Sequence, residues 1–296
     1  MLKLNYPVAV SDFDGTLLRS DNKISQHTRD VIQELIKAGG SFFIATGRMH
    51  CAIINHLEDA GLGGLDVPVI SYQGALVKSA ISNKVLYDSS LDLDTVTDII
   101  KEARARNLYI HAYIDDTLYV EKEMPWTTDY TNFLGITFTE VGDLLQFVTK
   151  KLSDKDQHHS CHKLLMMMET DIIEDELQHF LKKFGGGMDY ENRENAVKKE
   201  ARALFNTSSV HLLECVSINA GKDRAIEHVV KGMGCTLDNV MAIGDSLNDY
   251  SMVLRAGMGV AVQNADERVK LVAKYIAPSN DDDGVAYAIE KLILMR

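Results

Sequence analysis

The sequence predicts an α/β fold: a Rossmann-like parallel sheet with helices on both faces, interrupted by an inserted α+β domain. The first reason is a layout that recurs along the chain. In it, a continuous apolar run precedes a polar or glycine-rich cluster and then a helical pattern. Such runs are typical of strands buried on both faces of a parallel sheet. The expected strands are Pro7–Ser11, Ser41–Ala45, Val67–Ser71, Val240–Ile243, Gly259–Val262 and Tyr275–Ala277.

A helix is expected after the first strand, beginning near Ser25 and ending near Gly39. Val31, Leu35 and Ile36 fall on one face of such a helix and give it an apolar side to pack against the sheet. Glycine is common just beyond the C-terminus of a helix. This alternation of apolar strand and amphipathic helix is what a parallel sheet requires.

The second reason is a change of pattern between Tyr87 and Leu212. Here longer helical patterns alternate with strand-like runs, and none of these runs ends in a polar cluster of catalytic type. The segment IHAYIDDTLYV predicts a hairpin that turns at Asp115-Asp116, HKLLMMMET predicts a strand, and FGGGMDYENREN predicts a loop. The expected helices are Leu93–Arg106, Asp171–Phe184 and Asn195–Phe205.

The two patterns together predict two domains, as does a length of 296 residues. Residues 1–86 and 213–296 would form a discontinuous core. Residues 87–212 would form an α+β domain inserted between the two halves of that core.

The composition excludes several classes of protein. With 31 basic and 43 acidic residues, the formal net charge of −12 argues against a surface that binds nucleic acid or an anionic membrane. No window approaches the ~18 apolar residues that span a bilayer, and no signal peptide is evident. The four cysteines have no paired spacing, so reduced thiols are expected. We expect a cytoplasmic protein that acts as a monomer or a homodimer.

The third reason for the fold class is that polar clusters follow the expected strands, where ligands bind in open α/β sheets. Asp12 and Asp14 stand at positions i and i+2 after the first strand and so face the same side. Two carboxylates this close need a cation or a shared proton. One carboxylate could attack the phosphorus of a phosphate, and Mg²⁺ could neutralise the charge between these two anions. The other carboxylate could then move a proton.

Two further clusters offer groups for a phosphate. Thr46-Gly47-Arg48 provides a hydroxyl and a backbone N–H, although a plain helix cap is an equal alternative. Lys222 lies near the start of an expected helix, a suitable place for a cation that holds phosphate. A lone lysine is ordinarily solvated surface, so this signal is weak by itself.

The last cluster is GDSLND, residues 244–249, which again follows an expected strand. Asp245 and Asp249, together with Asp12, would make an oxygen-rich site suited to Mg²⁺. The alternative is an Asx-rich turn that caps the next helix, Asp249–Ala256.

Taken jointly, these motifs are more specific than any one of them. D-x-D-G-T, a hydrophobic residue before T-G-R, a downstream Lys and G-D-S-x-N-D occur in that order at successive strand ends. The sequence thereby resembles the haloacid dehalogenase-like (HAD) superfamily, and the insertion after SYQGALV resembles the type IIB cap of its Cof-type phosphatases. The resemblance implies the HAD fold and a Mg²⁺-dependent phosphatase of small phosphomonoesters, such as sugar phosphates or related metabolites.

The resemblance also implies roles for the two aspartates and their neighbours. Asp12 would be the nucleophile and a Mg²⁺ ligand, forming an aspartyl-phosphate intermediate. Asp14 would be the general acid/base and would bind the metal through its backbone carbonyl. Asp245 would ligate Mg²⁺, and Asp249 would support the metal directly or through water.

The remaining motif residues would hold the phosphoryl group. Thr46, Gly47 and Lys222 would contact it, and Asn248 would orient either Lys222 or the phosphate. Two positions depart from the family pattern: Gln73 stands where Asn is usual before Gly-Ala, and Gly221 precedes Lys222 where Ser-Lys-Gly is common.

Alternative interpretations remain open at this point. A phosphometabolite sensor without catalysis could use the same pocket, but it would not need Asp14. A phosphotransferase or phosphomutase is a second alternative on the same site. In the insert, HHSCH (158–162) is too crowded for usual zinc spacing and predicts a polar loop. Substrate choice is expected to lie in the insert, with candidate contacts at Tyr113, Asp115, Trp126 and Tyr130.

Overall fold

The computed structural model describes residues 4–60, 62–187 and 201–296. The chain divides into two compact units. The first comprises Met1–Tyr87 and Gly221–Arg296, and the second comprises Asp88–Ala220. No helix among the described residues is both long and apolar enough to cross a membrane.

The first unit contains an eight-stranded sheet in the order β15-β14-β13-β1-β2-β3-β4-β5. The six strands from β15 to β3 are parallel, and β4 pairs with β3 in the antiparallel direction. The strands are β1 (Val8–Asp12), β2 (Ser41–Ala45), β3 (Pro68–Ser71), β4 (Leu76–Ser79), β5 (Val85–Asp88), β13 (Val240–Gly244), β14 (Met258–Val262) and β15 (Tyr275–Ala277).

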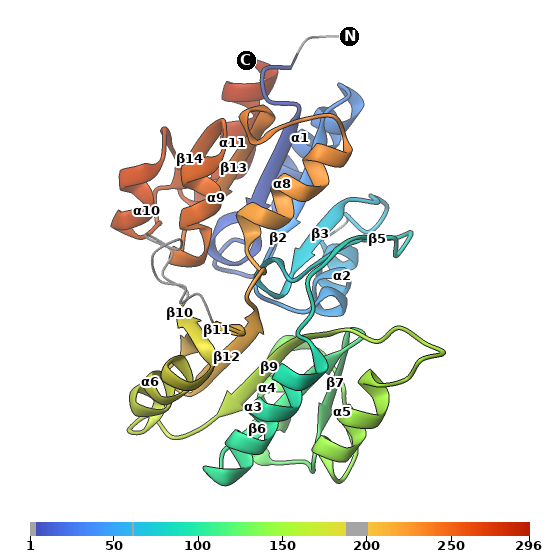
Figure 1. Cartoon of the computed structure of the whole chain (residues 1–296). Coiled ribbons are helices and arrows are strands. Elements are labelled where there is room, and N and C mark those ends of the chain that lie inside the picture. Colours follow the sequence, from blue (N-terminus) through green and yellow to red (C-terminus); the bar gives the residue numbers. More distant parts are fainter. Residues whose placement is uncertain (1–3, 61, 188–200) are drawn as a thin grey trace. The chain divides into compact units, whose positions relative to one another are not determined.

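Helices cover both faces of this sheet: α1 packs against α11 on one face and α8 against α9 on the other (Figure 1). They are α1 (Gln26–Lys37), α2 (His50–Asp59), α8 (Lys222–Gly232), α9 (Tyr250–Arg255), α10 (Glu267–Val272) and α11 (Gly284–Ile289). The predicted fold class, a parallel α/β sheet interrupted by an inserted α+β unit, is confirmed.

The first helix forms for the reasons read from the sequence. The side chain of Ser25 accepts the N–H of Thr28 at 3.0 Å and so caps the N-terminus of α1. Val31 and Leu35 are buried in the core. The chain leaves the helix through Gly39, whose φ of +93° suits glycine.

The strand register explains why the polar clusters meet. β1 lies between β2 and β13, with Asp12 paired opposite Ala45 and Ser11 opposite Ile243. Because these strands are parallel, their carboxyl ends share one edge of the sheet. The residues that follow Ala45 and Ile243 therefore emerge beside Asp12.

The second unit contains a seven-stranded sheet in the order β10-β11-β12-β9-β6-β7-β8. Its strands are β6 (Tyr109–Ile114), β7 (Thr117–Val120), β8 (Phe138–Glu140), β9 (Cys161–Met167), β10 (Gly185–Gly187), β11 (Ala203–Ser209) and β12 (Leu212–Ser217). Its helices are α3 (Leu93–Ala105), α4 (Pro125–Leu134), α5 (Leu144–Leu152) and α6 (Ile173–Phe184).

The predicted hairpin is confirmed. β6 and β7 are antiparallel and are joined by Asp115 and Asp116, with φ values of 51° and 60°. Positive φ at both central residues gives a turn whose twist matches that of the paired strands.

Two predicted elements in this unit are wrong. Ala203–Ser209 is strand β11 instead of the end of the helix predicted over Asn195–Phe205, because it pairs with β12 and completes the sheet. The rest of that helix up to residue 200 lies outside the described residues. Within the predicted loop, Gly185–Gly187 forms β10, where a Cβ on Gly185 would lie 2.3 Å from the Ala203 carbonyl oxygen.

The predicted return to the core at residue 213 also differs from the structure. Leu212–Ser217 is strand β12, which pairs with β9 and β11 in the second sheet. Residues 213–220 therefore belong to the second unit, and the chain re-enters the first at Gly221.

Candidate active site

Asp12 and Lys222 form a buried ion pair at the carboxyl edge of the first sheet. Asp12 ends β1 and is 4% exposed, and Lys222 opens α8 and is 1% exposed. The Lys222 ammonium donates to Asp12 Oδ1 at 2.5 Å and to Asp249 Oδ1 at 2.6 Å. One cation therefore serves two carboxylates inside the protein.

The negative charges of this cluster exceed the positive charge beside them. Asp12, Asp245 and Asp249 place carboxylate oxygens within 4.8 Å of one another. Burial, followed by the charge of Asp249, raises the pKa of Asp12 and of Asp245. Burial lowers the pKa of Lys222, but Asp12 and Asp249 together raise it above its ordinary value. A second cation would relieve the excess negative charge.

The loop after β13 holds its two aspartates in different ways. Asp249 is fully buried, and its Oδ2 accepts the N–H groups of Asp245 and Ser246, each at 3.1 Å. The turn-capping alternative thus applies to one oxygen of Asp249, while the other oxygen contacts Lys222. Asp245 instead accepts the hydroxyl of Thr16 at 2.6 Å and that of Ser246 at 2.8 Å.

The donor set fits a hard divalent cation. Within the described residues, Asp12, Asp245 and Asp249 are the one group of three or more acidic, His or Cys side chains close enough to share an ion. Carboxylate oxygens are the ligands that Mg²⁺ prefers. Such an ion would neutralise the negative charge that adds to burial in raising the pKa values of Asp12 and Asp245. The side chain of Asp14 does not join this group.

Asp14 is held by Arg48, a residue of the T-G-R motif that sequence reasoning did not select. The Arg48 guanidinium donates to both carboxylate oxygens, from Nε to Oδ2 at 2.9 Å and from Nη2 to Oδ1 at 2.6 Å. The Asp14 side chain is 48% exposed. Gly15 then turns the backbone with φ of +77°, at a point where a Cβ would lie 2.9 Å from Asp245 Oδ2. Asp12 and Asp14 therefore occupy different surroundings, one buried and one open to solvent.

The other predicted residues gather around Gln73. The Thr46 hydroxyl accepts the Arg48 N–H at 3.1 Å, in the manner of a local cap. A Cβ on Gly47 would lie 2.4 Å from Gln73 Nε2. Asn248 donates to Gln73 Oε1 at 3.3 Å. The groups that orient Lys222 are thus Asp12 and Asp249, whereas Asn248 contacts Gln73.

Gly74 allows the chain that carries Lys222 to approach the sheet. Its φ is +92°, and an added Cβ would lie 2.3 Å from the backbone carbon and oxygen of Gly221. This contact explains the glycine at position 74, because the backbone of Gly221 leaves no room there for a side chain.

We expect Gly74→Ala to lower the free energy of unfolding by about 2 kcal/mol or more, because both its φ and the contact with Gly221 oppose a Cβ. Urea denaturation provides the measurement. Gly39→Ala is the matched control: its φ is +93°, but no atom lies within 4 Å of an added Cβ. Equal losses in the two variants would contradict the importance of the close approach.

The histidine-rich run of the second unit has no arrangement for zinc. His159 Nδ1 contacts Asp115 Oδ2 at 2.6 Å, and His162 Nε2 contacts Asp88 Oδ2 at 3.1 Å. Burial raises the pKa of the Cys161 thiol to about 12, so it stays protonated. In the part of the chain that the structure describes, this run contributes to no cluster of metal ligands.

The remaining candidate contacts of the insert lie within the second unit. Tyr113 is buried, and the Lys163 ammonium lies 5.4 Å from the centre of its ring. Tyr130 also hydrogen-bonds Lys163. Trp126 packs against His211 with ring centres 5.9 Å apart. Lys163 is therefore a shared neighbour of two of these tyrosines that the sequence pattern did not indicate.

Comparison with known proteins agrees with the motif pattern. A family model for haloacid dehalogenase-like hydrolases matches residues 9–289. The 5-amino-6-(5-phospho-D-ribitylamino)uracil phosphatase YcsE of Bacillus subtilis (strain 168) is 30% identical over 239 residues, covering 74% of this chain and 96% of YcsE. The crystal structure of TM0651 from Thermotoga maritima has a TM-score of 0.81 at 26% identity and covers 97% of each chain.

A further solved structure bears on the type of insertion. The sugar phosphatase BT4131, described as a member of HAD subclass IIB, has a TM-score of 0.72 at 20% identity and covers 96% of this chain and 98% of its own. The fold of this chain, including its insertion, is thus similar to that of a subclass IIB protein.

Proposed function

Since the chain belongs to the haloacid dehalogenase-like hydrolases and relatives such as YcsE are phosphatases, we propose that it is a Mg²⁺-dependent phosphatase of small phosphomonoesters. The observation that carries this proposal is the buried pairing of Asp12 with Lys222 at 2.5 Å, inside a cluster of three carboxylates. A carboxylate of this kind is placed for covalent catalysis, and the lysine beside it for holding an anion.

The proposed reaction has two displacements at phosphorus. A carboxylate oxygen of Asp12 forms a bond to phosphorus as the bond to the leaving oxygen breaks, giving an aspartyl-phosphate and an alcohol. Asp14 supplies the proton that the leaving oxygen takes up. In the second step Asp14 removes a proton from water, whose oxygen attacks phosphorus and releases phosphate and Asp12.

The metal would be held by Asp12 and Asp245, with Asp249 and the backbone carbonyl of Asp14 as further support. A bound Mg²⁺ would reduce the repulsion between the carboxylates and an incoming phosphate. Thr46, Gly47 and Lys222 would bind the phosphoryl oxygens. Asn248, placed beside Gln73, would complete the side of the pocket that meets the phosphate.

The contrast between Asp12 and Asp14 supports their separate roles. Asp12 is buried and fixed by Lys222, as a nucleophile that must approach phosphorus in one direction requires. Asp14 is half exposed and held by the guanidinium of Arg48. Solvent access lets water reach the Asp14 carboxylate for the second step, while Arg48 fixes its direction.

Sugar phosphates and related polyol phosphates are the substrate class we propose. The name of YcsE specifies a phosphoribityl compound, and that of BT4131 specifies sugar phosphates. Residues of the insert, including Tyr113, Asp115, Trp126 and Tyr130, are proposed to select among them. We also propose that the protein works in the cytoplasm.

Phosphate release from a panel of sugar, polyol and nucleoside monophosphates tests the proposal. Turnover is expected with Mg²⁺, should stop with EDTA, and should return when Mg²⁺ is added in excess. Isothermal titration of Mg²⁺ into the metal-free protein should give one site that Asp245→Asn weakens. Turnover that survives EDTA would contradict the metal assignment. If no substrate of the panel releases phosphate, while ligands still raise the melting temperature of the protein, a sensor or a phosphotransferase would be favoured.

Asp14→Asn is expected to slow the first step by about 10²–10⁴-fold with an alkyl phosphate and much less with 4-nitrophenyl phosphate, whose leaving group needs no proton. Single-turnover kinetics with the two substrates provides the measurement. Asp21→Asn, on an exposed loop, is the control and should match the wild type. An equal slowing of both substrates would contradict the role of Asp14 as the acid.

A further inference from the structure

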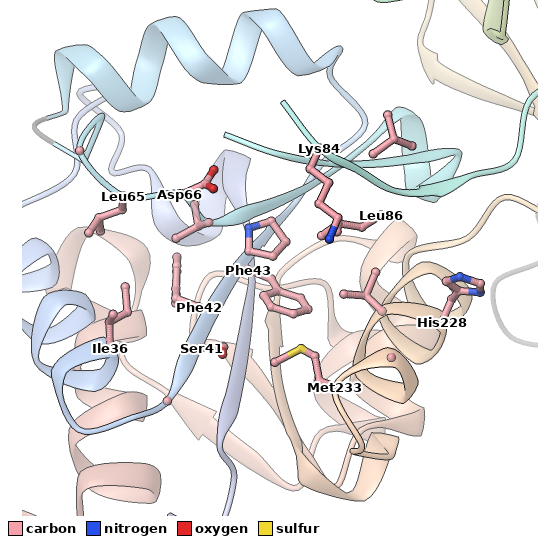
Figure 2. Close-up of a pocket in the computed structure, with 17 residues that line it drawn as sticks. Ile36, Ser41, Phe42, Phe43, Leu65, Asp66, Lys84, Leu86, His228 and Met233 are labelled. Carbon is pink, nitrogen blue, oxygen red and sulfur yellow. The ribbon is translucent and has the colours of Figure 1, made fainter. Parts of the chain in front are cut away.

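A second cavity lies in the first unit, at the edge of the sheet opposite the carboxylate cluster. Its volume is about 650 Å³, within the range of small-molecule sites. It is bounded by the start of β2 at Ser41, the loop before β3, the start of β5 and the end of α8 (Figure 2). Thr46 follows the other end of β2, roughly 15 Å away along the strand. The cavity is therefore separate from the proposed catalytic site.

The walls of the cavity are mainly apolar. Phe43 and Leu86 form part of its lining, and Met233 closes one side (Figure 2). Met233 is 46% exposed, and Val85, which also lines the cavity, is 53% exposed. Large apolar side chains that remain exposed around a concave surface are typical of a place where an apolar group binds.

Lys84 supplies a positive charge to this apolar space. Figure 2 shows its side chain extending into the cavity, whereas the carboxylate of Asp66 points away from it. Asp66 accepts the backbone N–H groups of Ile81 and Ser82 at 2.8 and 3.0 Å. Lys84 makes no ion pair with any residue that the structure describes. The charge of Asp66 is thus engaged elsewhere, while that of Lys84 faces the cavity.

His228 adds a second polar group on the same side. It lies on α8 and lines the cavity, with its ring centre 4.8 Å from that of Tyr87. The C-terminal ends of α1 and α8 also border the cavity, through Ile36 and Gly232. Carbonyl ends of helices disfavour a doubly charged anion such as phosphate. They disfavour a single carboxylate less, and the charge of Lys84 offsets that cost.

We propose that this cavity is a second binding site, which takes an organic carboxylate with an apolar ring or chain. The carboxylate pairs with Lys84 and receives a hydrogen bond from His228. The apolar body packs between Phe43, Leu86 and Met233. Binding at this site does not depend on the phosphatase reaction, so the two proposals are tested independently.

Calorimetric titration of the full chain with 2-naphthoate tests the proposal, in the presence of Mg²⁺ and saturating inorganic phosphate to occupy the catalytic site. We expect saturable binding that Lys84→Met weakens by roughly tenfold or more, since a charged hydrogen-bonding partner is lost. Lys291→Met, an exposed position near the C-terminus, should bind as the wild type does. The neutral analogue naphthalene-2-methanol should bind more weakly and equally to wild type and Lys84→Met.

A second variant tests the position independently. Met233→Glu places a like charge against the carboxylate at an exposed position and should abolish binding. Leu271→Glu, at a site 83% exposed on α10, should leave binding unchanged. Three results would overturn the proposal: no saturable binding, equal affinity in Lys84→Met and wild type, or unchanged affinity in Met233→Glu.

Discussion

Replacing Asp12 by asparagine is expected to abolish phosphate release, with a loss of roughly 10⁴-fold or more, while leaving the fold intact. The amide has nearly the shape of the carboxylate but lacks its nucleophilic oxygen. It also removes one charge from a cluster in which three carboxylates face one ammonium. The melting temperature of the metal-free protein should therefore stay the same or rise. Steady-state turnover and thermal denaturation of the same preparation measure both effects.

The control for this substitution is Asp21→Asn, which makes the same replacement of a carboxylate oxygen by an amide nitrogen at an exposed position. Asp12→Ala excludes activity regained through deamidation of the new asparagine. A variant that keeps near-normal turnover, in either form, would show that Asp12 is not the nucleophile.

Lys222→Met is expected to have the largest combined effect on stability and turnover. The substitution leaves Asp12 and Asp249 buried without their cation. Loss of one partner of a buried ion pair costs about 3–5 kcal/mol of folding free energy. Turnover should fall to background because the proposed phosphate contact is lost. Lys231→Met, an exposed position on the same helix, should change neither quantity.

The pH dependence gives this prediction a second readout. The pKa of Asp12 is raised by burial and by Asp249, so the folded protein binds a proton there more readily than the unfolded chain does. Its contribution to stability is therefore full at low pH and is lost as pH rises through the raised pKa. Lys222 lowers the pKa of Asp12, so in Lys222→Met that pKa should rise further and the loss of stability with rising pH should be larger. A metal-free Lys222→Met protein equally stable from pH 4 to pH 8 would contradict the charge balance described above.

The core of the fold could be predicted because its signals are local. The apolar run Val8–Val10 is long enough only for a strand, and the strand-end clusters fix a common edge once the sheet is parallel. The capped helix α1 shows the same agreement between local pattern and structure. These elements need no knowledge of distant partners.

The errors arose where distant pairing decides the structure. The helical pattern predicted from Asn195 runs on to Phe205, but Ala203–Ser209 is a strand because β12 and β10 offer partners on both sides. The boundary at residue 213 failed for the same reason, since β12 belongs to the sheet of the second unit. Neither pairing is visible in the local sequence.

The sequence predicted which charged residues form the site, but it did not predict the hydrogen bonds between the loops that carry them. Arg48 stands in a quoted motif, yet its bidentate contact with Asp14 depends on how two loops fold together. Thr16 belongs to the D-x-D-G-T motif, but the motif does not indicate that its hydroxyl donates a hydrogen bond to Asp245. The acidic run 281–283 leads into α11, with Asp283 as its N-cap, and also binds the loop after β1. Asp281 accepts from Ser20 at 2.8 and 2.6 Å, and Asp283 pairs with Arg19.

The central claim is that a phosphoryl group passes through Asp12, and rapid acid quench followed by peptide mass spectrometry tests it most directly. Asp14→Asn should be mixed with Mg²⁺ and 4-nitrophenyl phosphate, because it is expected to form the intermediate but to hydrolyse it slowly. We predict one added phosphoryl mass, located on Asp12, that decays as phosphate appears. Phosphate release with no phosphorylated peptide, or a phosphoryl group on any residue other than Asp12, would contradict this mechanism.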